Sequence, residues 1–320
     1  MRIVFMGTPD LAKVCLEAVY AHPAAEIVGV LTQPDKPKGR GMKMVAPPVK
    51  VFAEEKGLPV YQPVTLKDGA FAEELAKLDP ELIIVAAYGK ILPAYVLEYP
   101  KYGCVNAHGS LLPKYRGASP IQRAIMDGET ETGITAMYMN EGLDTGDMIL
   151  KLTCPITDED DFGTLHDTLA DLAGKAMCQV IDKILDGTVD DNRTVQPEEG
   201  VTYAAKIEKA DTLLSFAESA EKLFCQIRGL SPMPYAMTHT PDGKILKITT
   251  VKRDKAEKTY NEAPGTVVDL SEGIRVVCGD GKTLLFTGVV PEGKSRMAAM
   301  DYIRGRKIAV GDVLGKDDIG

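Results

Sequence analysis

The chain of 320 residues contains no tryptophan, only four histidines, and six cysteines that never form a Cys-x-x-Cys pair. Because structural zinc sites and disulfide frameworks need clustered cysteines or histidines, we expect reduced thiols and no bound metal. The longest apolar run, residues 82–88, is far too short to cross a bilayer, and no charged leader precedes the first strand. We therefore expect a cytoplasmic protein with no membrane attachment.

Basic residues are in the minority, with 37 Lys and Arg against 46 Asp and Glu and a net charge of −9. The deficit is uneven, because the chain from Ala205 onward holds 18 Lys and Arg against 16 Asp and Glu. Phosphate groups respond to a local basic face, so the total charge does not exclude nucleic-acid binding. The 45% hydrophobic and 26% charged content is typical of a soluble globular protein, long enough here for two domains.

Short apolar runs alternate with helical patterns over the first 140 residues. The runs span residues 3–6, 27–32, 58–61, 82–88, 104–107 and 134–139, and a one-sided helical stripe of Leu11, Val14, Cys15, Ala18 and Val19 lies between the first two. Strand and helix repeated in this way predict an α/β fold whose mostly parallel sheet is covered on both faces.

A second domain follows a polar stretch. Residues 163–185 carry a long helical pattern, and the stretch after it, DGTVDDNRTVQPEEG, is turn-rich and not expected to pack. Beyond a predicted helix at 220–229, alternating runs at 245–251, 265–268, 274–278 and 283–289 predict a small antiparallel barrel or sandwich. We therefore divide the chain into a first domain at 1–187, a linker at 188–207 and a C-terminal domain at 208–320.

The first predicted strand ends in Gly7-Thr8-Pro9-Asp10, where a dinucleotide-binding fold would carry the fingerprint GxGxxG. The second and third glycines are missing, and a bound pyrophosphate needs them for close approach to the backbone. This disfavours an NAD-dependent dehydrogenase. The alternative is a tight turn in which Thr8 or Asp10 caps the following helix.

Another predicted strand ends in Asn106-Ala107-His108. Because strand side chains alternate, Asn106 and His108 point to the same face. Either residue alone is most often structural, His108 as a satisfied core histidine and Asn106 as a cap or turn former. Ligands of open α/β sheets bind beyond the carboxyl ends of the strands, so the shared face favours a site.

Asp144 lies between Gly142 and Gly146, just after the predicted strand at 134–139. An aspartate in an ordinary tight turn is the alternative interpretation of this segment. Together with Asn106 and His108, however, Asp144 completes a set of amide donor, imidazole and carboxylate with no serine or cysteine nucleophile beside it. Such a set suits acyl transfer to a substrate that brings its own nucleophile.

Two segments concentrate positive charge. Residues 33–50 hold four prolines, two glycines and the basic residues Lys36, Lys38, Arg40, Lys43 and Lys50, which predicts an exposed loop. This loop is either simply solvated or an arm that grips phosphate and orders on its partner. A second basic cluster in the C-terminal domain is either a nucleic-acid surface or a strand edge guarded by lysine, and it comprises Lys244, Lys247, Lys252, Arg253, Lys255 and Lys258.

Four stretches of the sequence resemble the methionyl-tRNA formyltransferase family: NAHGSLLPKYRGASPIQRAI, GLDTGDM, VFMGTPD and TQPDKPKGRG. The resemblance is collinear over nearly the whole chain and continues through RGLSPMP, APGTVV and GDGKTLLF. The Asn-x-His and Asp set alone is shared with other enzymes that use 10-formyltetrahydrofolate, whereas the basic loop and the C-terminal barrel narrow the resemblance to this family. One departure is Met233-Pro234, where the family often carries Trp-Pro.

The resemblance implies a Rossmann-like formyltransferase fold with a mostly parallel sheet and a C-terminal OB-like β-barrel. It implies a monomer that transfers the formyl group of 10-formyltetrahydrofolate to the amino group of initiator methionyl-tRNA, without a metal. Asn106 would donate to the oxyanion, a protonated His108 would share its charge, and Asp144 would orient the imidazole and relay the proton.

The resemblance also implies the binding residues. The folate would lie along a wall formed by Ser110, Leu111, Leu112 and Pro113, with Tyr88 in the strand beneath its pterin. Arg40 would contact the acceptor end of the tRNA, and we expect Lys38 and Lys43 in the same loop to contact it too. Two alternatives remain open: a formyltransferase acting on glycinamide ribonucleotide or an amino sugar nucleotide, and a non-catalytic RNA-binding protein.

Overall fold

The computed structural model describes residues 1–38, 42–254 and 258–315. Contacts divide these residues into two compact units. The first unit contains Met1–Pro120, Glu131–Pro155 and His166–Ala204, and the second contains Ile121–Thr130, Ile156–Leu165 and the chain from Ala205 onward. The domain borders expected at 187 and 207 remain a prediction.

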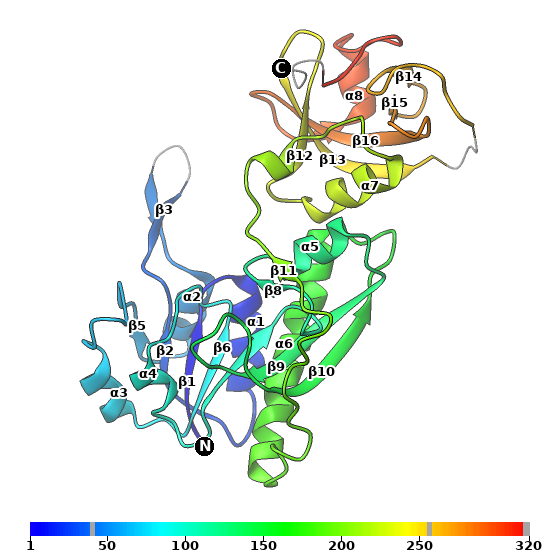
Figure 1. Ribbon diagram of the computed structural model, residues 1–320. Helices are drawn as coiled ribbons and strands as arrows, with labels where there is room; N and C mark the ends of the chain where they lie inside the picture. The colour runs from blue at the N-terminus through cyan, green and yellow to red at the C-terminus, as the bar shows by residue number, and fades with distance from the viewer. Residues whose placement is uncertain (39–41, 255–257, 316–320) are drawn as a thin grey trace. The chain divides into compact units, whose positions relative to one another are not determined.

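A seven-stranded sheet forms the centre of the first unit, in the order β10-β9-β7-β6-β1-β2-β5 (Figure 1). Its parallel strands are β1 (Arg2–Gly7), β2 (Glu26–Leu31), β5 (Val60–Tyr61), β6 (Leu82–Ala86) and β7 (Cys104–His108). β9 (Glu131–Tyr138) and β10 (Met148–Pro155) run antiparallel. The predicted Rossmann-like, mostly parallel sheet is confirmed, although the sequence pattern had not indicated β10.

Helices accompany these strands, as the alternating pattern predicts. In the first unit they are α1 (Asp10–Tyr20), α2 (Pro48–Glu55), α3 (Ala72–Leu78), α4 (Ala94–Leu97) and, from His166 on, α6 (Phe162–Leu185). From Ile121 on, α5 (Pro120–Met126) belongs to the second unit. α1 buries the stripe that includes Leu11, Cys15 and Val19. The residue preceding α1 is Pro9, and no side chain caps the helix. The interpretation that Thr8 or Asp10 caps α1 is therefore wrong, since the Thr8 hydroxyl donates to the Tyr88 carbonyl at 3.3 Å instead.

The basic stretch at 33–50, here called the arm, contains a short β-hairpin and ends in the first turn of α2, so it is not an irregular loop throughout. β3 (Lys36–Lys38) pairs antiparallel with β4 (Lys43–Val45). At its base the Lys50 ammonium donates to Asp35 Oδ2 at 2.9 Å. The residues after the turn remain exposed, and Met44 keeps 58% of its accessible surface. The strand β4 therefore projects its side chains outward, whereas Pro47 and Val49 at the end of the arm are buried.

The second unit is built on an antiparallel sheet in the order β12-β13-β16-β15-β14, with β17 beside β16. The strands are β12 (Ala236–His239), β13 (Ile245–Arg253), β14 (Val267–Asp269), β15 (Ile274–Val277), β16 (Thr283–Pro291) and β17 (Met297–Ala298), and the helices are η1 (Ala210–Thr212), α7 (Ala220–Gly229) and α8 (Ala299–Arg304). α7 begins after Ser219, whose hydroxyl accepts from the Lys222 N–H. This curled sheet confirms the expected OB-like domain.

Ion pairs already occupy part of the basic cluster expected on β13. Arg253 binds the carboxylates of Asp158 and Glu221, and Lys244 binds Asp242. Lys255 lies outside the described residues. A guarded strand edge can apply to only part of β13, because β12 and β16 pair with residues Leu246, Lys247 and Ile248 on both sides.

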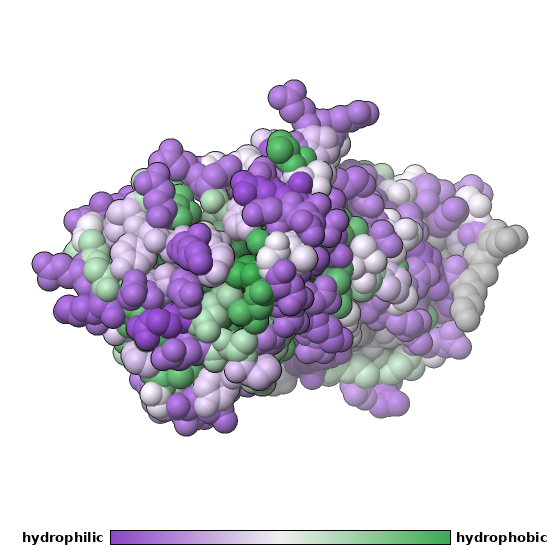
Figure 2. Space-filling model, turned by 90° about the horizontal axis from the view of Figure 1, so that it is seen from below, coloured by the Kyte–Doolittle hydropathy of each residue, from purple (hydrophilic) through white to green (hydrophobic). Residues whose placement is uncertain are grey.

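Hydrophilic residues cover most of the face seen in Figure 2, and apolar residues appear there in small areas between them. Even the 24-residue α6 carries charged side chains along its length. Within residues 1–38, 42–254 and 258–315, no helix combines the length and the hydropathy that a bilayer crossing requires.

Candidate active site

The carboxyl end of β7 carries Asn106 and His108 on one face. In register with the antiparallel β9, Asn106 lies opposite Met137 and His108 opposite Thr135. The Asn106 side chain is half-buried and has no hydrogen bond within the described part of the chain, whereas His108 is only 5% exposed. The amide of Asn106 therefore keeps its donors available.

His108 is fixed through one ring nitrogen. Its Nε2 lies 2.9 Å from the carbonyl oxygen of Tyr115, and since a carbonyl only accepts, Nε2 is the donor. The other nitrogen, Nδ1, lies 3.7 Å from Oδ2 of Asp144. The predicted pair of imidazole and carboxylate is thus brought together from two segments that are far apart in the sequence.

Asp144 occupies a tight loop between β9 and β10. Its φ of 51° is in the left-handed region, which is uncommon for residues with a side chain and which aspartate tolerates better than most. Close packing fixes the loop, because a Cβ at Gly146 would lie 1.8 Å from the carbonyl oxygen of Tyr138. The carboxylate is 17% exposed, and its Oδ2 accepts from the Gly117 N–H at 2.8 Å. Within residues 1–38, 42–254 and 258–315 its second oxygen, Oδ1, accepts no hydrogen bond, so it is available to a ligand.

Residues 193–204, here called the strap, pack against the Asp144 loop. Gln196 is 7% exposed, and its Nε2 donates to the carbonyl oxygens of Asp144 and Gly146 at 2.8 Å each. Thr194 exchanges two backbone hydrogen bonds with Met148 at the start of β10. The expectation that the stretch DGTVDDNRTVQPEEG does not pack is therefore wrong. Its polar groups form hydrogen bonds with the backbone of the Asp144 loop and of Met148.

The strap also pairs with the loop that follows His108. β11 (Tyr203–Ala204) runs parallel to β8 (Arg116–Gly117), and the N–H of Tyr115 donates to Oγ1 of Thr202 at 2.8 Å. Sequence reasoning missed Gln196 and Thr202. A single glutamine or threonine in a polar stretch has no periodicity by which it could be singled out.

The residues predicted to form the folate wall differ in solvent exposure. Ser110 and Leu112 are fully buried, while Leu111 and Pro113 are partly exposed. The Ser110 hydroxyl donates to the carbonyl of Lys114, and the Thr135 hydroxyl donates to the carbonyl of Ser110. A contact of Ser110 or Leu112 with a ligand would therefore use backbone atoms, and the folate wall remains a prediction.

Tyr88 lies in the core beneath the end of β6. It is 1% exposed, and burial raises the pKa of its hydroxyl to about 12. Its carbonyl oxygen accepts from Nε2 of Gln33 at 3.0 Å. The side chain of Tyr88 is thus enclosed, and the predicted position beneath the pterin stays untested.

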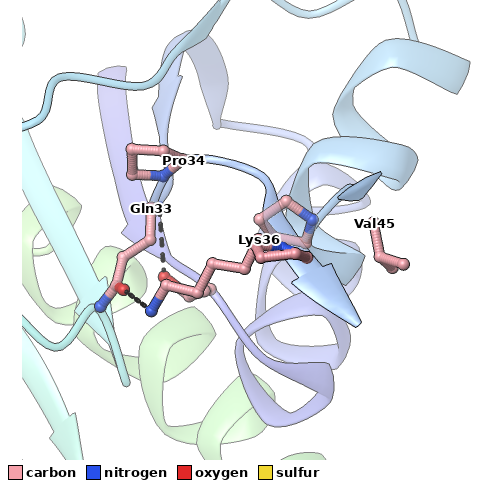
Figure 3. Close-up of a pocket in the computed structure, with 7 residues that line it drawn as sticks. Gln33, Pro34, Lys36 and Val45 are labelled. Atoms are coloured by element: carbon pink, nitrogen blue, oxygen red, sulfur yellow. Dashed lines mark hydrogen bonds between the residues drawn. The ribbon is translucent and has the colours of Figure 1, made fainter. Parts of the chain in front are cut away.

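A cavity of about 190 Å³ lies at the base of the arm. It is lined by Thr8, Gln33, Pro34, Lys36, Pro37, Val45 and Pro47. Figure 3 shows Lys36 reaching toward Gln33, whose Oε1 accepts from the ammonium at 2.7 Å. None of the three predicted catalytic residues lines this cavity, which belongs instead to the segment predicted to meet tRNA.

The structure describes two of the three residues predicted to contact tRNA. Lys43 is exposed on β4, and the backbone of Lys38 lies opposite it on β3. Arg40 lies outside the described residues. Within the described ranges no group of three His, Cys, Asp or Glu is arranged to hold a metal, and the absence of a metal remains an expectation.

Comparisons with known proteins extend over both units. A family model described as formyl transferase matches residues 1–181, and a model of the formyl transferase C-terminal domain matches residues 206–307. The methionyl-tRNA formyltransferase of Bacillus licheniformis is 43% identical over 318 residues, which is 99% of this chain and 99% of that protein. The methionyl-tRNA formyltransferase of Acetivibrio thermocellus is 44% identical over 317 residues, 99% of this chain and 100% of that protein.

Solved structures share the fold at low identity. An N-formyltransferase from Helicobacter canadensis, determined with folinic acid and dTDP-3-aminofucose, has a TM-score of 0.66 at 19% identity over 89% of this chain and 98% of that one. HypX from Aquifex aeolicus, determined with tetrahydrofolic acid, has a TM-score of 0.62 at 16% identity over 95% of this chain and 47% of that one. From the full-length identity and the two matched domains, the chain belongs to the formyl transferases and, among them, to the methionyl-tRNA formyltransferase family.

Proposed function

We propose that this protein transfers the formyl group of 10-formyltetrahydrofolate to the free amino group of initiator methionyl-tRNA, using Asn106, His108 and Asp144. The assignment of methionyl-tRNA as the acceptor rests on the sequence identity of 43% and 44% to two methionyl-tRNA formyltransferases. This identity extends along the whole chain and includes the C-terminal domain. Formylation of an initiator tRNA serves translation, so we expect the enzyme to work in the cytoplasm.

The folate donor is supported by what related folds hold. The Helicobacter enzyme was determined with folinic acid and HypX with tetrahydrofolic acid, and both carry this fold. The Helicobacter structure also contains an amino sugar nucleotide. The sequence identity between that enzyme and this chain is 19%, which supports a shared fold and not a shared acceptor. A small-molecule amine acceptor is accordingly not favoured.

The first chemical step is attack of the methionyl amine on the formyl carbon. The nitrogen lone pair forms the new C–N bond, and the carbonyl electrons move to oxygen, which becomes an oxyanion. Asn106 has a half-buried amide with no hydrogen bond in the described chain, so its N–H groups are free to donate to that oxygen. Removing one such donor typically costs about 10²–10³ in rate.

The second step is collapse of the tetrahedral species. The bond from carbon to N10 breaks, the attacking nitrogen loses a proton and N10 gains one, which yields formylmethionyl-tRNA and tetrahydrofolate. One oxygen of Asp144 accepts from the Gly117 N–H, and the other accepts no hydrogen bond from the described residues. This second oxygen can therefore take the amine proton and pass it on. A proton on Nδ1 of His108, 3.7 Å from that carboxylate, adds positive charge beside the oxyanion.

The arm provides the nucleic-acid contact in this proposal. Lys43 is exposed on β4, and Arg40 lies in the sequence between β3 and β4. Guanidinium and ammonium groups neutralise phosphates, which makes binding weaken steeply with salt. The cavity at the base of the arm is a concave surface that the same segment offers to the acceptor end.

The test is a choice among acceptors. Purified protein is mixed with 10-formyltetrahydrofolate and with charged initiator tRNA, uncharged tRNA, glycinamide ribonucleotide or an amino sugar nucleotide. We expect rapid formylation of the charged tRNA only. Comparable turnover of either small-molecule amine would contradict the proposal.

A further inference from the structure

The strap glutamine has its full hydrogen-bonding capacity engaged around the Asp144 loop. Both N–H groups of Gln196 donate, one to the Asp144 carbonyl and one to the Gly146 carbonyl, each at 2.8 Å. Its Oε1 accepts from Nε and Nη2 of Arg116 at 3.0 and 2.7 Å. Leaving a buried polar group of Gln196 without its partner would lower the stability of the folded protein. The four contacts therefore fix this side chain in a single orientation.

The carbonyl that Gln196 holds belongs to a residue in an uncommon backbone conformation. Asp144 has a φ of 51°, in the left-handed region that aspartate tolerates better than most residues with a side chain, so contacts with its neighbours help to fix it there. The Gly117 N–H holds the carboxylate of Asp144, and Gln196 holds its backbone. Without the Gln196 donors, the backbone carbonyl of Asp144 loses this restraint, and the Gly117 contact and the packing at Gly146 remain.

Three consecutive residues link both halves of the site to the strap. The Tyr115 carbonyl accepts from His108, the Arg116 side chain donates to Gln196, and the Gly117 N–H donates to the Asp144 carboxylate. The segment 115–117 and the strap therefore form one network. A shift of Gln196 would reach the Asp144 carboxylate through its own backbone and through Arg116.

We propose that Gln196 is a positioning residue of the formyl transfer: it fixes the backbone of Asp144 so that the carboxylate meets both His108 and the substrate amine. The inference rests on the proposed function, because it concerns the geometry of the same reaction. Gln196 touches no reacting atom. Its effect is exerted on turnover through Asp144 and not on substrate binding.

Gln196→Leu removes the donors and the acceptor while keeping a side chain of similar size. We expect kcat with charged initiator tRNA to fall about 10- to 100-fold, since misplacing a catalytic group by about 1 Å has effects of that order. KM for both substrates should stay within a factor of about three, in keeping with a loss confined to the chemical step. An unchanged kcat, or a loss confined to KM, overturns the inference.

Gln196→Glu distinguishes the hydrogen bonds that Gln196 accepts from Arg116 from those that it donates to the Asp144 loop. It also serves as a second variant if Gln196→Leu does not fold. The carboxylate still accepts from Arg116, but it has no N–H for the carbonyls of Asp144 and Gly146. The inference predicts a kcat loss similar to that of Gln196→Leu. Wild-type kcat in Gln196→Glu would assign the role to Arg116 alone and overturn it.

A double-mutant cycle with Asp144→Asn tests whether Gln196 acts through Asp144. Once the carboxylate is gone, its position no longer matters, so Gln196→Leu should lower the residual kcat by less than about threefold in this background. A merely structural role would lower kcat by the same factor in both backgrounds. Full additivity therefore contradicts the inference.

Gln226 offers a chemically matched control. Its Nε2 donates to two carbonyl oxygens, those of Asp211 and Leu213, at 2.8 and 3.1 Å within the second unit. Gln226→Leu should lower the melting temperature while leaving kcat within about twofold. An inactive wild-type enzyme on charged tRNA would defeat the proposed function, whereas an active wild type with an equally active Gln196→Leu defeats only the inference.

Discussion

The arm and the strap are both polar, proline-containing segments between regular elements, yet they relate to the site in opposite ways. The arm exposes its side chains, as at Lys43 and Met44. The strap buries Gln196 and binds the backbone of two loops. One segment is free to meet a partner, and the other is committed to the fold.

The difference lies in what backbone groups each segment meets. Strands β3 and β4 pair with each other, so the arm satisfies its own backbone and needs no further contact. The strap instead faces loops whose carbonyls lack partners in the sheet, and its side chains supply the missing donors. We therefore expect changes at the strap and its site to alter kcat, and changes at the arm to alter KM for tRNA.

The largest effects are expected from the groups that the strap holds and their neighbour on β7. His108→Ala, Asp144→Asn and Asn106→Ala should each lower kcat by about 10²–10³ while leaving the fold intact. Steady-state kinetics and thermal unfolding measure the two quantities. Near wild-type turnover in all three variants would contradict the catalytic assignment. It would also contradict the expectation that the strap influences kcat through these residues.

Gly117→Ala should break the contact between β8 and β11. Gly117 has a φ of 119°, and a Cβ there would lie 2.8 Å from the carbonyl oxygen of Ala204. We expect a destabilisation of about 1–3 kcal/mol, measured by urea unfolding, together with a fall in kcat because the Gly117 N–H supports Asp144.

Gly57→Ala is the control for the backbone angle. Gly57 has a φ of 68° and nothing within 4 Å of an added Cβ, so only the conformational cost of about 1–2 kcal/mol applies. Its kcat should not change. If Gly57→Ala and Gly117→Ala lowered kcat equally, the strap would have no special connection with the site.

Substitutions in the arm should act on binding. Arg40→Ala and Lys43→Ala should raise KM for charged tRNA severalfold with little change in kcat or in KM for the folate. Each lost phosphate contact should reduce the slope of log affinity against log salt by about 1. An equal loss of folate and tRNA binding would contradict the role given to the arm.

The smallest effect is a pH dependence at the base of the arm. Hydrogen bonds from Gln62 and Lys50 hold the pKa of the Asp35 carboxyl below its ordinary value of 3.8. A lowered pKa in the folded state adds stability that is present above pH 3.8 and is lost as the pH falls through the folded value.

Asp35→Asn tests this dependence. The free energy of unfolding should be lower than that of wild type at pH 7, and the gap should shrink as the pH falls below about 4. Urea unfolding at several pH values measures it. A gap that stays constant with pH would mean that the Asp35 charge does not anchor the arm.

The sequence predicted most of the regular elements because their apolar residues repeat with the period of a strand or a helix. α7 at Ala220–Gly229 matches its prediction residue for residue, whereas β10 was missed although Lys151 and Thr153 alternate with apolar residues as in a half-buried strand. The close approach of His108 to Asp144 was predicted from strand ends alone. Gln196 was not, because hydrogen bonds to loop carbonyls follow from three-dimensional contacts that no local pattern records.

The pairing of β11 with β8 has a consequence for synthesis of the protein. A ribosome that has made the chain as far as Leu185 has produced every strand of the parallel sheet and all three catalytic candidates. Residues 196 and 202–204, which hold the loops of the site, are still to come. The nascent chain can therefore complete its sheet before it has a finished catalytic centre, and a fragment cut at Leu185 should fold its strands yet remain a poor catalyst.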